Sequence, residues 1–286
     1  MPTIAVAGAT GHLGRLAVEA LLSRGVPAAE IVATGRDLDK LKDLTDRGMR
    51  PARVDYADPV GLREAFTGVR KLLFVSGSEV GQRIPQHTAV IEAAKEAGVE
   101  LVAYTSAPHA DTSSMRLVSE HRATEELLRA SGLPFTLLRN SWYHENYTAQ
   151  IPVYLRFGVV TGAAGQGRIS AAARADYAEA AAAVLTTEGH AGAVYELGGD
   201  TGFTLTELAE EVSRQTGQQV TYRDLSQADL EEVLRGAGLP DPLAAILADV
   251  DRAVAEGELQ VDTGDLSRLI GRPTTPLSEA VAAALG

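Results

Sequence analysis

The sequence predicts an α/β protein: a doubly wound parallel sheet with helices on both faces, joined to a smaller C-terminal α/β lobe. Two observations lead to this fold class. The chain opens with an apolar run at residues 4–7, a glycine-rich turn and a helical pattern. Apolar runs of strand length then alternate with helical segments as far as residue 139, and this alternation is typical of βαβ units. A chain of 286 residues is long enough for such a domain and a lobe.

The turn after the first strand predicts a dinucleotide site of the Rossmann type. Gly8 permits a sharp exit from the strand, Gly11 lets the backbone approach a pyrophosphate, and Gly14 lets the helix pack closely. The helix N-terminus offers unpaired N–H groups and the positive end of its dipole to phosphates. The strand before the turn and the helix after it are the context that this motif requires. We therefore assign to the cofactor the residues Gly8, Ala9, Thr10, Gly11, His12 and Leu13.

The end of the second predicted strand, residues 30–35, indicates which dinucleotide binds. In this fold an acidic residue there accepts a hydrogen bond from the ribose 2′-hydroxyl, whereas a basic residue pairs with a 2′-phosphate. Arg36 comes first after the strand, and its planar guanidinium suits a phosphate, so we favour NADPH over NADH. Asp37 can face the same ribose. Lys40 is either a second residue that binds the phosphate or a surface lysine. For Arg36, the alternative to binding the phosphate is that it is a solvated loop residue.

The following elements add contacts along the same edge of the sheet. A third strand at 51–54 precedes Asp55, which either meets the adenine amino group or is a plain loop carboxylate. The apolar fourth strand, 71–75, is predicted to be buried on both faces. It ends next to the switch point of the sheet in a segment that either lines the cofactor or is a plain turn: Ser76, Gly77 and Ser78. The remaining elements are strands at 100–104 and 135–139 and helices at 38–47, 59–67, 83–97 and 119–130.

The catalytic pair of many short-chain reductases is absent. Those enzymes carry a Ser and a Tyr-x-x-x-Lys motif, in which the Tyr transfers the substrate proton and the Lys lowers its pKa. Ser106 stands at the Ser position, but Leu117 and His121 stand at the Tyr and Lys positions, and no Tyr-x-x-x-Lys occurs in the chain. We therefore expect either redox chemistry that needs little proton transfer from the protein, or cofactor binding without turnover.

Several motifs along the chain are typical of one family: Gly8–Gly11, Ser78–Arg83, Tyr104–Ser106, Leu138–Tyr143, Ala175–Tyr177, Val194–Leu197 and Leu269–Thr274. Together they resemble the NmrA-like atypical short-chain dehydrogenase/reductase family, and within it the bacterial type 2 NAD(P)H:quinone oxidoreductases. The family also lacks the Tyr/Lys pair. The resemblance implies NADPH-dependent reduction of quinones without flavin, while other members reduce triphenylmethane dyes or sense NADP without known catalysis.

The same resemblance implies roles for individual residues. Arg36 would take the 2′-phosphate, residues 76–78 would pass beside the middle of the cofactor, and the segment after the sixth strand would flank the nicotinamide. At that nicotinamide end the implied cofactor contacts are Asn140, Ser141, Trp142, Tyr143, His144 and Glu145, with Arg174 closing over the site.

Reduction makes a quinone aromatic, so hydride transfer needs mainly alignment and a polar group near the developing phenolate oxygen. Asn140, Tyr143 and His144 are the catalytic candidates. His144 is otherwise a solvated loop histidine. Trp142 either stacks on a flat acceptor ring or packs against the lobe.

The domain boundaries follow from this order of elements. Residues 1–150 are predicted to form the NADP-binding domain and residues 151–286 the substrate lobe, with 175–199 returning to the main sheet. Residues 158–167 are expected to be a glycine-rich connection, and a short strand is expected at 219–222. Helices are predicted at 175–185, 229–235, 242–257 and 277–285, and a Thr204–Glu207 capping box opens another that runs to about residue 216.

Composition excludes several classes of function. The net charge of −12 argues against a nucleic-acid or anionic-membrane partner. The absence of cysteine excludes disulfides and zinc–thiolate sites, and the six scattered histidines, with His87 and His121 expected to be structural, predict no metal. No apolar stretch reaches the roughly 18 residues of a membrane span and no secretion signal opens the chain. We expect a cytoplasmic protein acting on small molecules, with a homodimer left open.

Two functions of different classes remain. The first is an NADPH-dependent reductase of quinones or similar flat acceptors, and the second is a non-catalytic NADP(H) sensor of the NmrA type. The aromatic and amide-rich loop at 140–147 favours the enzyme. A sugar-nucleotide epimerase is disfavoured because it would also need the Tyr/Lys pair.

Overall fold

The computed structural model describes residues 3–286. In this part of the chain a seven-stranded parallel sheet has the order β3-β2-β1-β4-β5-β6-β8. Its direction of winding reverses between β1 and β4, which places the topological switch point at their carboxyl ends. The predicted doubly wound sheet is confirmed. The strands are β1 (Ile4–Ala7), β2 (Ile31–Gly35), β3 (Arg50–Arg53), β4 (Lys71–Phe74), β5 (Leu101–Ser106), β6 (Phe135–Asn140) and β8 (Val194–Leu197).

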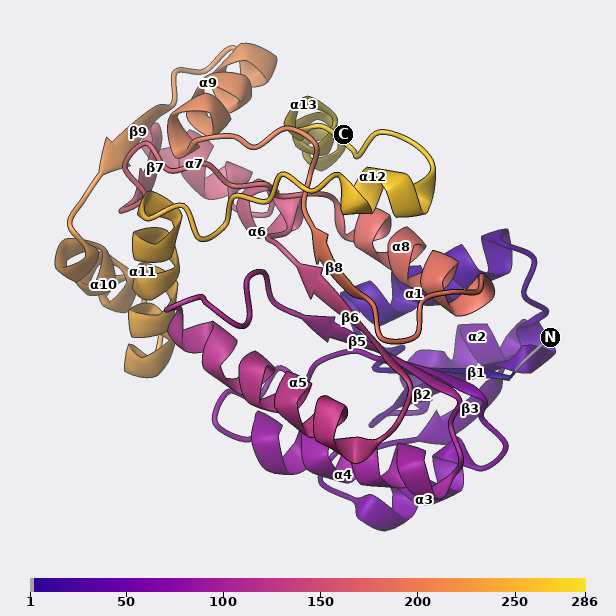
Figure 1. Cartoon of the computed structure of the whole chain (residues 1–286). Coiled ribbons are helices and arrows are strands. Elements are labelled where there is room, and N and C mark those ends of the chain that lie inside the picture. Colours follow the sequence, from indigo (N-terminus) through magenta and orange to yellow (C-terminus); the bar gives the residue numbers. More distant parts are fainter. Residues whose placement is uncertain (1–2) are drawn as a thin grey trace.

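Helices cover both faces of the sheet because successive strand residues point to opposite sides. Ile4 and Val6 face the first core cluster, whereas Ala5 and Ala7 face the second. Figure 1 shows α3, α4 and α5 on one side and α1 and α8 on the other. The first face carries α1 (His12–Ser23), α2 (Lys42–Asp46), α8 (Arg174–Thr186) and α12 (Asp265–Ile270), and the second carries α3 (Pro59–Phe66), α4 (Arg83–Glu96) and α5 (Ser119–Ser131).

The lobe lies beyond the carboxyl ends of β5, β6 and β8 (Figure 1). Its two strands, β7 (Val159–Gly162) and β9 (Thr221–Asp224), pair in parallel and share a third core cluster with the surrounding helices. The capping box is confirmed, since Thr204 Oγ1 accepts from the Glu207 N–H at 3.2 Å and Glu207 accepts from the Thr204 N–H at 2.8 Å. The lobe helices are α6 (His144–Thr148), α7 (Ile151–Phe157), α9 (Leu205–Thr216), α10 (Gln227–Gly236), α11 (Asp241–Ala255) and α13 (Leu277–Leu285).

Three elements differ from the sequence prediction. The segment expected to be a glycine-rich connection contains β7, which is stabilised by pairing with the distant β9. The expected loop at 140–147 contains the short helix α6. Residues 265–270, for which no element was predicted, form α12, which packs on α8 and β8. Like 174–197, this segment belongs to the main sheet layer, and the division of the chain at residue 150 stays a prediction.

No helix within residues 3–286 combines the length and the apolar character needed to cross a membrane.

Candidate dinucleotide and acceptor site

The glycine turn brings backbone groups to the carboxyl end of β1. Gly8 has a φ of +86°, a backbone conformation that residues with a Cβ rarely adopt. The Gly11 N–H donates to the Gly8 carbonyl at 2.9 Å, and a Cβ on Gly14 would lie 2.2 Å from that carbonyl oxygen. Helix α1 begins at His12 without a side-chain cap on its N-terminal N–H groups and without an acidic residue in its first turn. These groups are therefore available to an anion.

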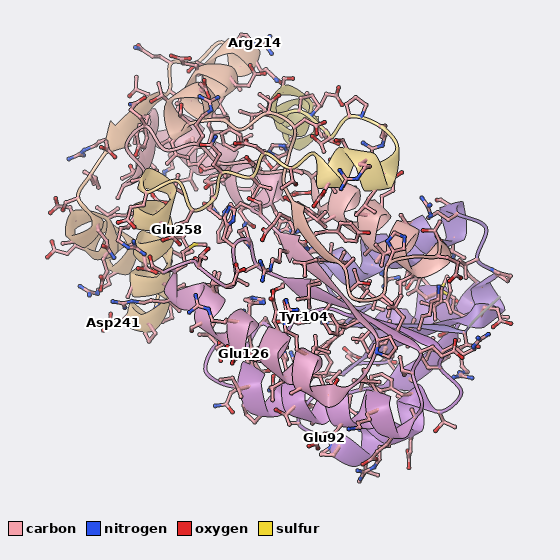
Figure 2. All side chains as sticks on the ribbon, viewed as in Figure 1. Glu92, Tyr104, Glu126, Arg214, Asp241 and Glu258 are labelled. Carbon is pink, nitrogen blue, oxygen red and sulfur yellow. The ribbon has the colours of Figure 1, made fainter. Side chains whose placement is uncertain are left out.

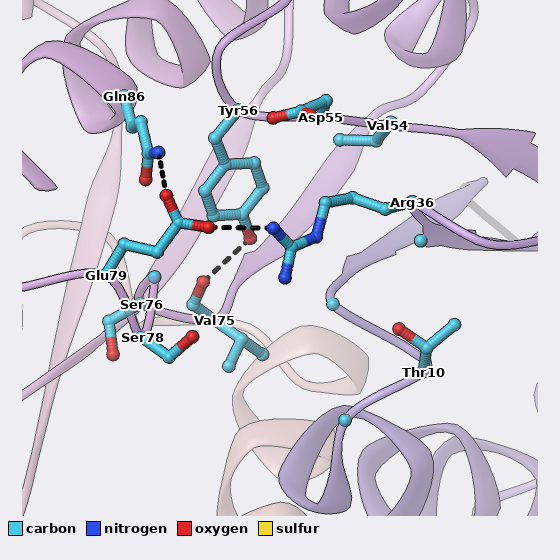
Figure 3. Close-up of a pocket in the computed structure, with 14 residues that line it drawn as sticks. Thr10, Arg36, Val54, Asp55, Tyr56, Val75, Ser76, Ser78, Glu79 and Gln86 are labelled. Carbon is cyan, nitrogen blue, oxygen red and sulfur yellow. Dashed lines mark hydrogen bonds and ion pairs between the residues drawn. The ribbon is translucent and has the colours of Figure 1, made fainter. Parts of the chain in front are cut away.

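A cavity of about 250 Å³ opens beside this turn at the switch point (Figure 3). We call it the switch-point cavity. Arg36 lies in its wall, whereas Asp37 accepts a hydrogen bond from the Asp39 N–H and, like Lys40, is not among the lining residues. The lining comes from the turn, the segments at the ends of β2, β3 and β4, and helix α4: Gly8, Thr10, Gly11, Gly35, Arg36, Val54, Asp55, Tyr56, Val75, Ser76, Gly77, Ser78, Glu79 and Gln86.

The segment after β4 is fixed from behind by buried polar side chains. The Gly77 N–H donates to His87 Nε2 at 3.0 Å, and its carbonyl accepts from Arg83 Nε at 2.6 Å. Burial lowers the pKa of His87 to about 3, so the ring is neutral and its nitrogen can accept. The other ring nitrogen meets Thr124 Oγ1 at 2.8 Å. His87 is the structural helix residue that the sequence predicts, and it also orders the cavity wall, which the sequence did not indicate.

A second cavity, of about 360 Å³, lies at the N-terminus of α1 and reaches the start of α8. Its lining includes Thr10, Gly11 and His12 from the turn, together with Glu145 and Arg174. Glu145 accepts from the Arg174 N–H at 2.9 Å and so caps α8. The structure thus brings the predicted Arg174 and Glu145 next to the helix N-terminus predicted to bind phosphate.

Asn140 and Tyr143 lie together beneath Arg174. Asn140 Nδ2 donates to Tyr143 Oη at 3.4 Å, and the Arg174 guanidinium carbon lies 4.8 Å from the centre of the Tyr143 ring. Burial raises the pKa of Tyr143, which therefore keeps its phenolic proton at neutral pH. Asn140 is 5% exposed, and its Oδ1 has no hydrogen-bond partner among residues 3–286. A buried acceptor without a partner is costly, and a ligand N–H such as a carboxamide would satisfy it.

Three predicted residues of the same segment turn toward the lobe. His144 is buried, its ring stacks on Phe203 at 5.7 Å, and its Nε2 lies 3.0 Å from the Thr275 carbonyl. The alternative that it is a solvated loop histidine is wrong. Like Asn140 and Tyr143, it is not among the residues that line the two cavities, but its ring alone of the three faces the lobe. Burial also lowers the pKa of His144, so it is neutral. Ser141 Oγ donates to the Leu259 carbonyl at 3.3 Å, and Trp142 packs against the lobe core.

Ser106 and His121, which were matched to the Ser and Lys positions of other reductases, lie in buried networks. Tyr104, between the sheet and α5 (Figure 2), meets His121 Nδ1 at 2.8 Å, and burial lowers the pKa of His121 to about 3. Ser106 Oγ donates to Glu125 at 2.6 Å. Arg139 binds the same carboxylate at 2.7 Å and Glu196 at 2.8 Å. Ser106 and His121 are therefore committed to structural contacts. No group of three or more potential metal ligands converges within residues 3–286.

A doubly wound parallel sheet with a glycine turn, an uncapped helix N-terminus and a cavity at the switch point defines a dinucleotide-binding protein of the Rossmann class. Residues 8–188 match the model of the NAD(P)H-binding family, and the chain belongs to that family. The resemblance inferred from the motifs is also confirmed, because the relatives below match the chain over nearly its whole length.

Quinone oxidoreductase 2 of Escherichia coli K12 is 52% identical over 278 residues, which is 97% of each chain. The crystal structure of the E. coli NADPH-dependent quinone oxidoreductase complexed with NADPH matches with a TM-score of 0.96, over 99% of this chain and all of that one. The triphenylmethane reductase of Citrobacter sp. complexed with NADP(H) is 38% identical with a TM-score of 0.93, over 98% of this chain and 99% of that one.

Proposed function

We propose that this protein is an NADPH-dependent oxidoreductase that reduces quinones by direct hydride transfer without a flavin. The observation that carries the proposal is the 52% identity with E. coli quinone oxidoreductase 2 along nearly the full length of both chains. The two cavities beside the glycine turn support the proposal, because the backbone N–H groups and the charged side chains of this cleft fit a phosphorylated dinucleotide.

Different parts of the cleft would hold different parts of NADPH. The N–H groups at the start of α1 suit the pyrophosphate. Arg36, in the wall of the switch-point cavity, suits the 2′-phosphate. At the other end, the unpaired Oδ1 of Asn140 suits an N–H donor of the nicotinamide carboxamide. Gly14 belongs to the same fit, since a Cβ there would push α1 away from the turn.

Bound NADPH supplies the hydride, and the protein supplies alignment and polarity. Tyr143 Oη keeps its proton at neutral pH and can donate a hydrogen bond toward an acceptor oxygen that gains negative charge. Arg174, above the Tyr143 ring, adds positive charge to the same region. This arrangement requires no Tyr/Lys pair, because a quinone becomes aromatic on reduction. We assign the catalytic role to Asn140 and Tyr143 and not to His144, whose ring faces the lobe.

The deciding experiment follows the loss of NADPH absorbance at saturating cofactor with a panel of benzoquinones and naphthoquinones, using protein whose flavin content has been measured. We expect quinone-dependent oxidation by flavin-free protein, faster with NADPH than with NADH. Tight NADPH binding without turnover of any quinone would instead support the NADP(H)-sensor alternative. Turnover that depends on added flavin would contradict direct hydride transfer.

A further inference from the structure

An ion pair spans the mouth of the switch-point cavity. Arg36 Nη1 donates to Glu79 Oε1 at 2.7 Å, with Arg36 at the end of β2 and Glu79 on the segment after β4 (Figure 3). The two side chains are 66% and 46% exposed, so the pair lies at the rim of the cavity. A ligand group that approaches the Arg36 guanidinium therefore meets the Glu79 carboxylate at the same place.

Other contacts hold Glu79 in this position. Its Oε2 accepts from Gln86 Nε2 at 2.9 Å, and Gln86 is fixed in helix α4. The segment that carries Glu79 begins at Gly77, whose N–H and carbonyl are bound by His87 and Arg83. The carboxylate is thus held by Gln86 in addition to its ion pair with Arg36.

In this position the Glu79 carboxylate disfavours binding of NADPH, whereas its effect on binding of NADH is neutral or favourable. A 2′-phosphate bound to Arg36 would be a second anion close to the Glu79 carboxylate, and the two negative charges would repel each other. The phosphate also competes for a guanidinium that Glu79 already uses. A ribose 2′-hydroxyl carries no charge and can donate a hydrogen bond to a carboxylate, as it does to acidic residues near this position in NAD-binding sheets.

We propose that Glu79 is a cofactor-selectivity residue that opposes the 2′-phosphate at Arg36 and so narrows the preference for NADPH over NADH. The inference rests on the proposed function, since it takes NADPH as the bound cofactor. Asp37, the acidic residue that follows Arg36 in the sequence, is not assigned this role, because it does not line the cavity and its contact is local, with the Asp39 N–H.

The test is Glu79→Gln, with dissociation constants for NADPH and NADH measured by fluorescence titration. We expect the NADPH constant to fall about three- to tenfold, from the loss of an exposed ion pair and of the repulsion, and the NADH constant to stay the same or rise. Adenosine 2′,5′-bisphosphate should bind more tightly to the variant, whereas 5′-AMP should not. Glu100→Gln is the matched control, because it breaks another exposed pair, Arg70–Glu100, before β5.

Unchanged or weaker NADPH binding by Glu79→Gln overturns the inference, provided that the wild-type protein binds and oxidises NADPH. Weaker binding would mean that Glu79 and Arg36 both contribute favourably to NADPH binding. An equal gain from Glu100→Gln also overturns it, because the effect would then be one of net charge. A wild-type protein that fails to bind NADPH at all overturns the proposed function instead. Thermal unfolding of each variant shows that the comparison is made on folded protein.

Discussion

Replacement of Asp251 by Asn should stabilise the protein at neutral pH. Asp251 lies on α11 within the lobe, and its Oδ2 accepts from the Ala163 N–H at 2.8 Å in the loop after β7. Burial raises the pKa of this carboxyl from 3.8 to about 6, against the smaller lowering effect of the Ala163 hydrogen bond. Asn keeps an oxygen that can accept from Ala163 and removes the charge that burial penalises.

The size and sign of the effect follow from the pKa shift of Asp251. A folded state with the raised pKa binds more proton than the unfolded chain between pH 3.8 and about 6, so wild-type stability falls as pH rises through this window. One pKa unit corresponds to about 1.4 kcal/mol, so a shift of about two units predicts a loss of about 3 kcal/mol by pH 7. The Asn variant lacks this titration and should exceed the wild type by up to about that amount at pH 7.

Urea unfolding of both proteins at a series of pH values measures this difference in the free energy of unfolding. Asp46→Asn, on the exposed surface of α2, controls for the change in net charge. The reasoning fails if the wild-type and Asp251→Asn stabilities run parallel between pH 4 and 7, because the carboxyl would then titrate as it does in water.

Three further substitutions test the site. Gly14→Ala should abolish NADPH binding, since its Cβ collides with the turn, while Gly236→Ala, where a Cβ meets nothing within 4 Å, should leave activity intact; equal activity of the two would refute the close packing. His87→Leu removes the acceptor of the Gly77 N–H and should lower the free energy of unfolding by about 1–3 kcal/mol. It should also raise the KM for NADPH more than it changes kcat. An unaltered KM would contradict the role of His87 in positioning the cavity wall. Tyr143→Phe keeps the ring under Arg174 but loses the hydroxyl, so kcat for quinones should fall about tenfold or more with little change in NADPH affinity. Unchanged kcat would exclude Tyr143 as the hydrogen-bond donor to the acceptor oxygen.

The sequence predicts best those features that depend on local signals. The apolar strands, the glycine turn and the Thr204 capping box each have their cause within a few residues, and each forms as expected. The strand β7 could not be predicted from its own residues, because it exists through pairing with β9 some sixty residues later.

Side-chain direction was beyond local reasoning in the same way. Nothing near His144 in the sequence shows that its ring stacks on Phe203 and meets the Thr275 carbonyl. Arg36 was found because it directly follows a strand, whereas its partner Glu79 comes from another strand end, and only the parallel order β2-β1-β4 brings the two together. The only sequence feature that points to a cofactor contact for Glu79 is its position in the segment after the fourth strand, next to the switch point.

The route of the chain between the sheet layer and the lobe has a consequence for how the protein unfolds. The backbone enters the lobe after β6, returns as α8 and β8, enters again for α9 to α11, returns as α12 and ends in the lobe as α13. Helix α1 packs against α8, so a fragment ending at residue 150 would expose the apolar face of α1 to water. We therefore expect a fragment of residues 1–150 to unfold more readily than the full chain.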